Sequence, residues 1–119
     1  MPRILVVDDD EQLLLLVRQI LQKEGYEVLS TADGPHGIEI YIRDRPDLVL
    51  LDVGLPSMDG IEVLKNIRAQ DEKAKVIVFT AYAAEWTSTE AYASGASDFI
   101  EKPVKPSLLL ERIRKLLER

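Results

Sequence analysis

Three short apolar runs stand out along the chain, and each contains only four residues. They occupy residues 4–7, 48–51 and 76–79. Because four consecutive apolar residues suit a strand that is covered on both faces, the runs predict the inner strands of a parallel sheet. Residues 27–32 and 98–100 are weaker strand candidates.

Helical periodicity fills the intervals between these runs. Apolar residues recur at helical spacing between residues 13 and 21, and Gly25 follows in a position where helices commonly end. Similar patterns predict helices over residues 35–44, over 60–67 after Asp59, over about 84–94, and from Pro106 onward. Strand and helix thus alternate five times, which predicts an α/β domain with a five-stranded parallel sheet and helices on both faces. We expect one domain over residues 1–119, because no linker or repeat interrupts the pattern.

Composition narrows the function classes. Fifteen Lys and Arg residues stand against 21 Asp and Glu residues, so the net charge is −6. Nucleic-acid binders usually carry a basic surface, so direct DNA or RNA binding is not expected. The absence of cysteine excludes disulfides and thiolate metal sites. The longest apolar run has five residues, whereas a membrane span needs about 20, so no membrane association is expected.

Polar residues break the apolar pattern at the carboxyl ends of the predicted strands. Asp8 and Asp9 follow the first strand, Asp52 follows the third, Thr80 the fourth, and Lys102 lies just past the fifth. In open α/β sheets the ligand crevice lies outside these ends, where the strand order reverses. A strand order of 2-1-3-4-5 would place the first and third strands side by side. The three aspartates would then converge, with Thr80 and Lys102 beside them.

Two other segments with acidic residues are not expected to join the three aspartates. Asp10 and Glu11 belong to the start of the first helix, where acidic residues are favoured. Asp33 and Gly34 follow the second strand, which lies at the sheet edge in this order, so we expect them outside the site.

Converging carboxylates repel one another. Two charges 4 Å apart cost about 4 kcal/mol at an effective dielectric constant of 20. A bound cation, a lysine or a proton must offset that cost. One or two carboxylates, with water and phosphate oxygens, are what Mg²⁺ prefers, and Lys102 with Thr80 suits phosphate oxygens. The pattern therefore indicates phosphoryl chemistry, with a carboxylate as the candidate nucleophile.

Several spaced motifs follow one another along the chain: Ile4-Leu5-Val6-Val7-Asp8-Asp9, Pro46-Asp47-Leu48-Val49-Leu50-Leu51-Asp52, Leu55-Pro56-Ser57-Met58-Asp59-Gly60, Thr80-Ala81, Gly95-Ala96, Asp98-Phe99-Ile100 and Lys102-Pro103. With these motifs in this order, the chain resembles the receiver domains of two-component response regulators, a family of CheY-like proteins with a flavodoxin-like fold. The resemblance covers essentially the whole chain.

The resemblance implies a phosphoacceptor and a metal site. Asp52 would accept a phosphoryl group from a phosphohistidine on a sensor histidine kinase or a histidine phosphotransfer protein. Asp9, Asp52 and the backbone carbonyl of Gly54 would hold Mg²⁺ or Mn²⁺, and Asp8 would help through water. The domain would catalyse its own Mg²⁺-dependent phosphorylation and dephosphorylation at Asp52, but it would not be a turnover enzyme.

The resemblance also implies a switch. Lys102 would hold one phosphoryl oxygen, Thr80 would move to another, and Phe99 would rotate inward behind it. A cis peptide bond before Pro103 would turn Lys102 toward the site. Phosphorylation would alter the surface around the fourth and fifth helices for a downstream partner, in the cytoplasm.

Two other classes remain open. A haloacid-dehalogenase-like phosphatase also starts with a strand followed by Asp-x-Asp, as residues 4–10 do, but Gln12 stands where Thr or Val is usual and the chain is short for that fold. Multiple-turnover phosphatase activity would identify it. A receiver-like binding module that works without phosphorylation would fail to label with acetyl phosphate and Mg²⁺.

Overall fold

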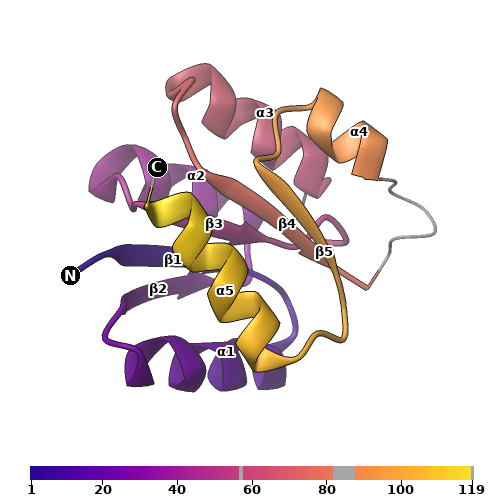
Figure 1. Ribbon diagram of the computed structural model, residues 1–119. Helices are drawn as coiled ribbons and strands as arrows, with labels where there is room; N and C mark the ends of the chain where they lie inside the picture. Colours follow the sequence, from indigo (N-terminus) through magenta and orange to yellow (C-terminus); the bar gives the residue numbers. More distant parts are fainter. Residues whose placement is uncertain (57, 82–87, 119) are drawn as a thin grey trace.

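The structure, a computed structural model, describes residues 1–56, 58–81 and 88–118. Strands and helices alternate along these ranges (Figure 1): β1 (Arg3–Val7), α1 (Glu11–Lys23), β2 (Glu27–Thr31), α2 (Gly34–Asp44), β3 (Leu48–Leu51), α3 (Gly60–Gln70), β4 (Val76–Thr80), α4 (Ser88–Ala93), β5 (Asp98–Glu101) and α5 (Pro106–Leu117). The helix expected over about 84–94 corresponds to α4, and residues 84–87 of that prediction lie outside the described residues.

The strands form one parallel sheet in the order β2-β1-β3-β4-β5. The first and third strands are therefore neighbours, with Val7 opposite Leu51 at their carboxyl ends. Both the strand order and the parallel arrangement confirm the predicted fold.

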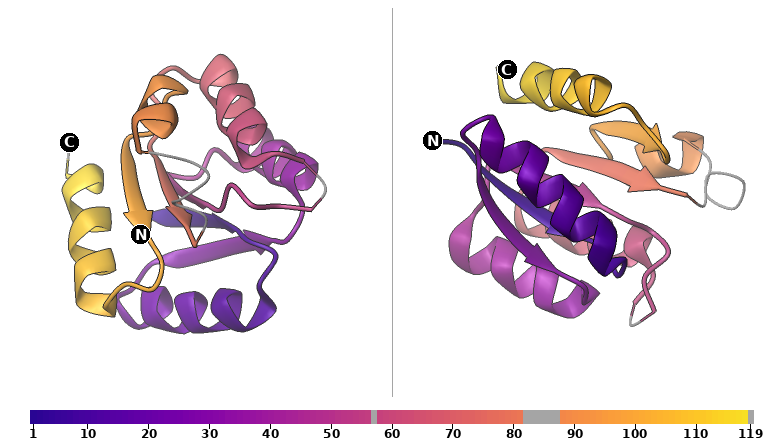
Figure 2. Two further views of the ribbon diagram at one scale, coloured as in Figure 1. Left: turned by 90° about the vertical axis from the view of Figure 1, so that its right-hand side faces the viewer. Right: turned by 90° about the horizontal axis from the view of Figure 1, so that it is seen from below.

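Alternate side chains of the inner strands point to opposite faces of the sheet and belong to two separate hydrophobic clusters. Leu5 and Val7 pack with α2, α3 and α4 on one face of the sheet, whereas Ile4 and Val6 pack with α1 and α5 on the other. Figure 2 shows these two helical layers on opposite sides of the sheet. This double cover explains why the inner strands are apolar without alternation. Among the described residues, no helix is both long and apolar enough to cross a membrane.

Aspartate side chains cap the N-termini of α1, α2 and α3. Asp10 accepts hydrogen bonds from the backbone N–H groups of Gln12 and Leu13, both at 3.1 Å. Asp33 caps α2 and Asp59 caps α3 in the same way. Because such caps satisfy N–H groups that a helix leaves unpaired, they fix where each helix starts. The interpretation of Asp10 as part of a helix start is confirmed.

Candidate functional site

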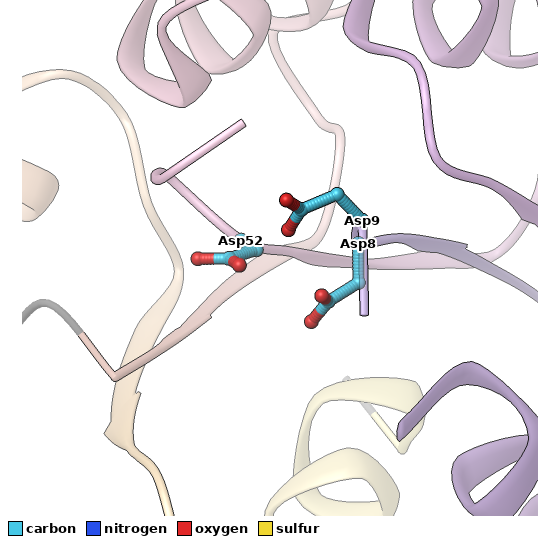
Figure 3. A group of neighbouring side chains, drawn as sticks. All are labelled: Asp8, Asp9 and Asp52. Carbon is cyan, nitrogen blue, oxygen red and sulfur yellow. The ribbon is translucent and has the colours of Figure 1, made fainter. Parts of the chain in front are cut away.

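Three aspartates gather at the carboxyl ends of β1 and β3. Asp8 and Asp9 directly follow β1, and Asp52 directly follows β3. One carboxylate oxygen from each lies within 4.8 Å of the others, and Figure 3 shows the three side chains grouped at these strand ends. Asp8 and Asp52 are only 2% and 3% exposed, whereas Asp9 is exposed to solvent. The expected convergence therefore occurs, with two carboxylates inside the protein and one at its surface.

Lys102 links the two buried carboxylates. Its Nζ lies 2.5 Å from Asp8 Oδ2 and 3.5 Å from Asp52 Oδ2. The same ammonium group lies 5.3 Å from the centre of the Phe79 ring, which shields one side of it. Two carboxylates thus share this ammonium group, and with the third carboxylate, Asp9, an excess of negative charge remains in the cluster.

The buried carboxylates also accept backbone hydrogen bonds. The N–H of Asp10 donates to Asp8 at 3.0 Å, and the N–H of Gly54 donates to Asp52 at 3.1 Å. Burial nevertheless raises the pKa of Asp8, and the hydrogen bonds from Lys102 and Asp10 offset that increase only in part. Burial thus opposes the charged form of Asp8.

The donor set of this cluster fits a small divalent cation. Carboxylate oxygens are hard ligands, and Mg²⁺ is typically bound by one or two of them together with water. The excess negative charge is what such an ion would neutralise. Gly54, whose carbonyl is another expected ligand, lies two residues past Asp52.

The other predicted residues lie on β4, on β5 and just beyond β5. Thr80 ends β4 and is fully buried, and its backbone carbonyl accepts the N–H of Lys102 at 2.9 Å. Phe99 lies on β5 opposite Val78 and is half-buried against the core beneath α2, α3 and α4. The peptide bond between Lys102 and Pro103 is cis, which is the isomer that the resemblance implies.

Sequence reasoning missed how closely α2 approaches the loop that follows Asp52. Gly34, the first residue of α2, packs against that loop: a Cβ atom there would lie 3.1 Å from Met58 Cβ. The expectation that Asp33 and Gly34 lie outside the site holds for the acidic cluster, which contains neither. The signal was present, because glycine often marks a close approach of two segments.

Comparison with known proteins identifies the family. The model of the response regulator receiver domain matches residues 4–114. The chain belongs to this family. The chemotaxis protein CheY of Bacillus subtilis (strain 168) is 40% identical over 116 residues, which are 97% of this chain and 97% of that protein.

Solved structures agree with this family. A CheY-like receiver domain protein from Methanospirillum hungatei JF-1 has a TM-score of 0.95 and 38% identity, over 99% of this chain and 94% of that one. The response regulator protein TrrA from Thermotoga maritima, solved in complex with Mg²⁺ and BeF, has a TM-score of 0.89 and 34% identity, over 98% of this chain and 99% of that one. The family is that of a receiver domain of two-component systems and not of a turnover phosphatase.

Proposed function

We propose that this receiver domain accepts a phosphoryl group on Asp52 from a phosphohistidine of a sensor histidine kinase or a histidine phosphotransfer protein. The observation that carries the proposal is the pair of buried carboxylates, Asp8 and Asp52, that share the ammonium group of Lys102 beside the exposed Asp9. A buried carboxylate beside a cation is a suitable nucleophile for phosphoryl transfer.

The transfer exchanges one bond of phosphorus for another. A carboxylate oxygen of Asp52 forms the new O–P bond while the N–P bond to the donor imidazole breaks. The electron pair of that bond stays on the imidazole nitrogen. Because such reactions depend mainly on positioning and charge stabilisation, the groups around Asp52 decide the rate.

Three residues would receive the transferred group. The Lys102 ammonium group, 3.5 Å from Asp52, is placed to hold one phosphoryl oxygen. Thr80, at the end of the neighbouring strand β4, would bind another oxygen through its hydroxyl group. Phe99 on β5 would then rotate inward and change the surface around α4 and α5, which a downstream partner would recognise.

The metal would be held by Asp9, Asp52 and the carbonyl oxygen of Gly54, with Asp8 acting through water. Mg²⁺, or Mn²⁺ in its place, would supply positive charge for the phosphoryl oxygens. TrrA, a related structure, was solved in complex with Mg²⁺ and BeF, which supports a Mg²⁺ site in this fold. We also propose a cytoplasmic location. No direct contact with nucleic acid is proposed, because the net charge is −6.

Acetyl phosphate labelling tests the proposal. With Mg²⁺, the parent should gain the mass of one phosphoryl group, and Asp52→Asn should gain none because an amide cannot form the acyl phosphate. Asp10→Asn is the matched control, because Asp10 caps α1 rather than joining the cluster. Undiminished labelling of Asp52→Asn would refute the assignment. Repeated turnover of a phosphate ester would instead favour the phosphatase.

A further inference from the structure

Two helices close on the loop that follows Asp52, and each does so through a glycine. At Gly60, the first residue of α3, a Cβ atom would lie 2.5 Å from the carbonyl oxygen of Asp52. At Gly34, the first residue of α2, it would lie 2.9 Å from Val63 Cγ2 and 3.1 Å from Met58 Cβ. Real Cβ atoms essentially never come within 3.0 Å of other atoms, so a side chain at Gly60 would press on backbone, and one at Gly34 would require Val63 to move and Met58 to shift by a few tenths of an ångström.

The first part of the loop, next to Asp52, is packed against the core. Val53 and Leu55 are only 2% and 8% exposed. The N–H of Gly60 donates to the carbonyl oxygen of Val53 at 3.1 Å, which joins the start of α3 to the loop. A hypothetical Cβ on Gly34 would also lie 3.6 Å from Leu55 Cδ1, next in the chain to Gly54. The contact with Leu55 is an ordinary van der Waals contact, whereas the approach to Met58 Cβ would force a shift of a few tenths of an ångström. Because packed interiors transmit displacement, that shift would act on the loop that carries Gly54.

We propose that Gly34 is a positioning residue for the metal site. By lacking a side chain, it lets the start of α2 settle against Leu55 and Met58, and the loop thereby holds the Gly54 carbonyl at the correct distance from Asp52. The inference rests on the proposed role of that carbonyl as a metal ligand. It extends the site to α2, a helix that contributes no residue to the acidic cluster.

Mg²⁺ makes such positioning important. This ion demands nearly ideal octahedral geometry with short metal–oxygen distances, whereas Ca²⁺ accepts longer and more variable ones. A ligand displaced by a few tenths of an ångström should therefore weaken Mg²⁺ binding more than Ca²⁺ binding. A general loss of stability has no reason to change the ratio of the two affinities.

Metal titrations of the Gly34→Ala variant test this role. We expect Gly34→Ala to bind Mg²⁺ about 10–100-fold more weakly, the range seen when residues behind metal ligands are changed. The loss for Ca²⁺ should be smaller. Isothermal titration calorimetry measures both affinities without phosphorylation, and thermal unfolding without metal shows whether each variant is folded.

Gly37→Ala is the matched control. Gly37 also lies in α2, and a Cβ atom there would lie 3.0 Å from Val7 Cγ2 and 3.6 Å from Thr31 Cγ2. These neighbours are the ends of sheet side chains, one of them next to Asp8, and none belongs to the loop that carries Gly54, so the control separates pressure on the loop from pressure on the sheet. We expect Gly37→Ala to keep the parental ratio of Mg²⁺ to Ca²⁺ affinity.

A compensating substitution keeps the inference falsifiable. Val63→Ala removes the nearest atom facing Gly34, so the double variant Gly34→Ala/Val63→Ala should bind Mg²⁺ with an affinity between that of Gly34→Ala and that of Val63→Ala alone. If Gly34→Ala does not fold, the double variant is compared with Val63→Ala and should still bind more weakly, because Met58 Cβ remains 3.1 Å away.

The outcomes separate this inference from the proposed function. A parent that binds Mg²⁺, with folded Gly34 variants that bind it equally well, would overturn the positioning role alone. A parent that binds no Mg²⁺ would overturn the metal site itself and the inference with it.

Discussion

The residues around Asp98 and those around Asp8 shift the pKa of the aspartate in opposite directions. Asp98, at the start of β5, receives hydrogen bonds from the Arg112 guanidinium, from the Tyr92 hydroxyl at 3.2 Å and from the Phe99 N–H at 2.8 Å. Burial raises the pKa of Asp98, but these donors outweigh burial and the pKa is lowered overall. Asp8, just after β1, is also hydrogen-bonded but is buried where Asp98 is only half-buried, and its pKa is raised.

The difference lies in the balance of donors and charges around each carboxylate. Asp98 has a guanidinium group that contacts both of its oxygens. Asp8 shares Lys102 with Asp52, whose own negative charge raises the pKa of Asp8 further. A carboxylate with enough hydrogen-bond donors stabilises the native fold. A carboxylate close to other carboxylates destabilises it and is suited to binding a cation. The same residue type thus stabilises the fold at the start of β5 and is suited to binding a cation just after β1 and β3.

The largest expected effect comes from Asp98→Asn. Losing a charged acceptor for Arg112 and Tyr92 should lower the free energy of unfolding by about 2 kcal/mol at pH 7, since hydrogen bonds to charged groups contribute about 1.5–3 kcal/mol. Urea unfolding measures it. A carboxyl with a lowered folded pKa stabilises above its unfolded value, here 3.8, and that contribution disappears as pH falls through the folded pKa.

The deficit of Asp98→Asn should therefore shrink between pH 5 and the acid range. A deficit that stays constant over this whole interval would show that the pair with Arg112 carries no net charge effect.

The same substitution at Asp52 should have the opposite sign. In metal-free buffer Asp52→Asn should raise the free energy of unfolding by about 1 kcal/mol, because repulsion from Asp8 and Asp9 disappears and outweighs the lost attraction to Lys102. Mg²⁺ should stabilise the parent by mass action and the variant much less. Melting curves with and without Mg²⁺ give both quantities. A loss of stability equal to that of Asp98→Asn would mean that the two clusters do not differ.

Most of the fold could be predicted from local patterns. The run at residues 48–51 matches β3, and Asp59 with Gly60 marks the start of α3, because buried strands and helix caps leave signals in neighbouring residues. The start of α2 was placed one residue late, at Pro35 instead of Gly34. Asp33 caps that helix through the N–H of His36, so its first turn includes Gly34.

The convergence of the three aspartates followed from the strand order, since polar residues at the ends of adjacent parallel strands must meet, whereas Gly54, Phe99 and the cis bond before Pro103 came from the family resemblance. Two features did not follow. The burial of Asp8 and the exposure of Asp9 depend on which way each side chain turns after β1. The approach of Gly34 to Met58 depends on how closely α2 packs beside the loop, which no local pattern encodes.

The smallest expected effect on stability is that of Tyr92→Phe, which tests how much the contacts around Asp98 depend on α4. Tyr92 is 47% exposed and donates its hydroxyl group to Asp98. Tyr92→Phe removes that one hydrogen bond and keeps the ring, so we expect a loss of about 0.5 kcal/mol, at the low end for a hydrogen bond because solvent can replace it. In an Asp98→Ala background, which offers the hydroxyl group no side-chain acceptor at position 98, the same change should cost nothing further, which a double-mutant cycle measures.

The pKa of Tyr92 gives a second, independent measurement of that contact. Burial and the nearby charge of Asp98 raise this pKa above its usual value of 10.0. A tyrosine with a raised folded pKa stabilises below its unfolded pKa, and that contribution is lost as pH rises through the folded value. Asp98→Asn should therefore bring the ionisation of one tyrosine to lower pH in an absorbance titration. If the titration is unchanged while the stability falls, Arg112 alone carries the cluster and α4 is not tied to β5 through Tyr92.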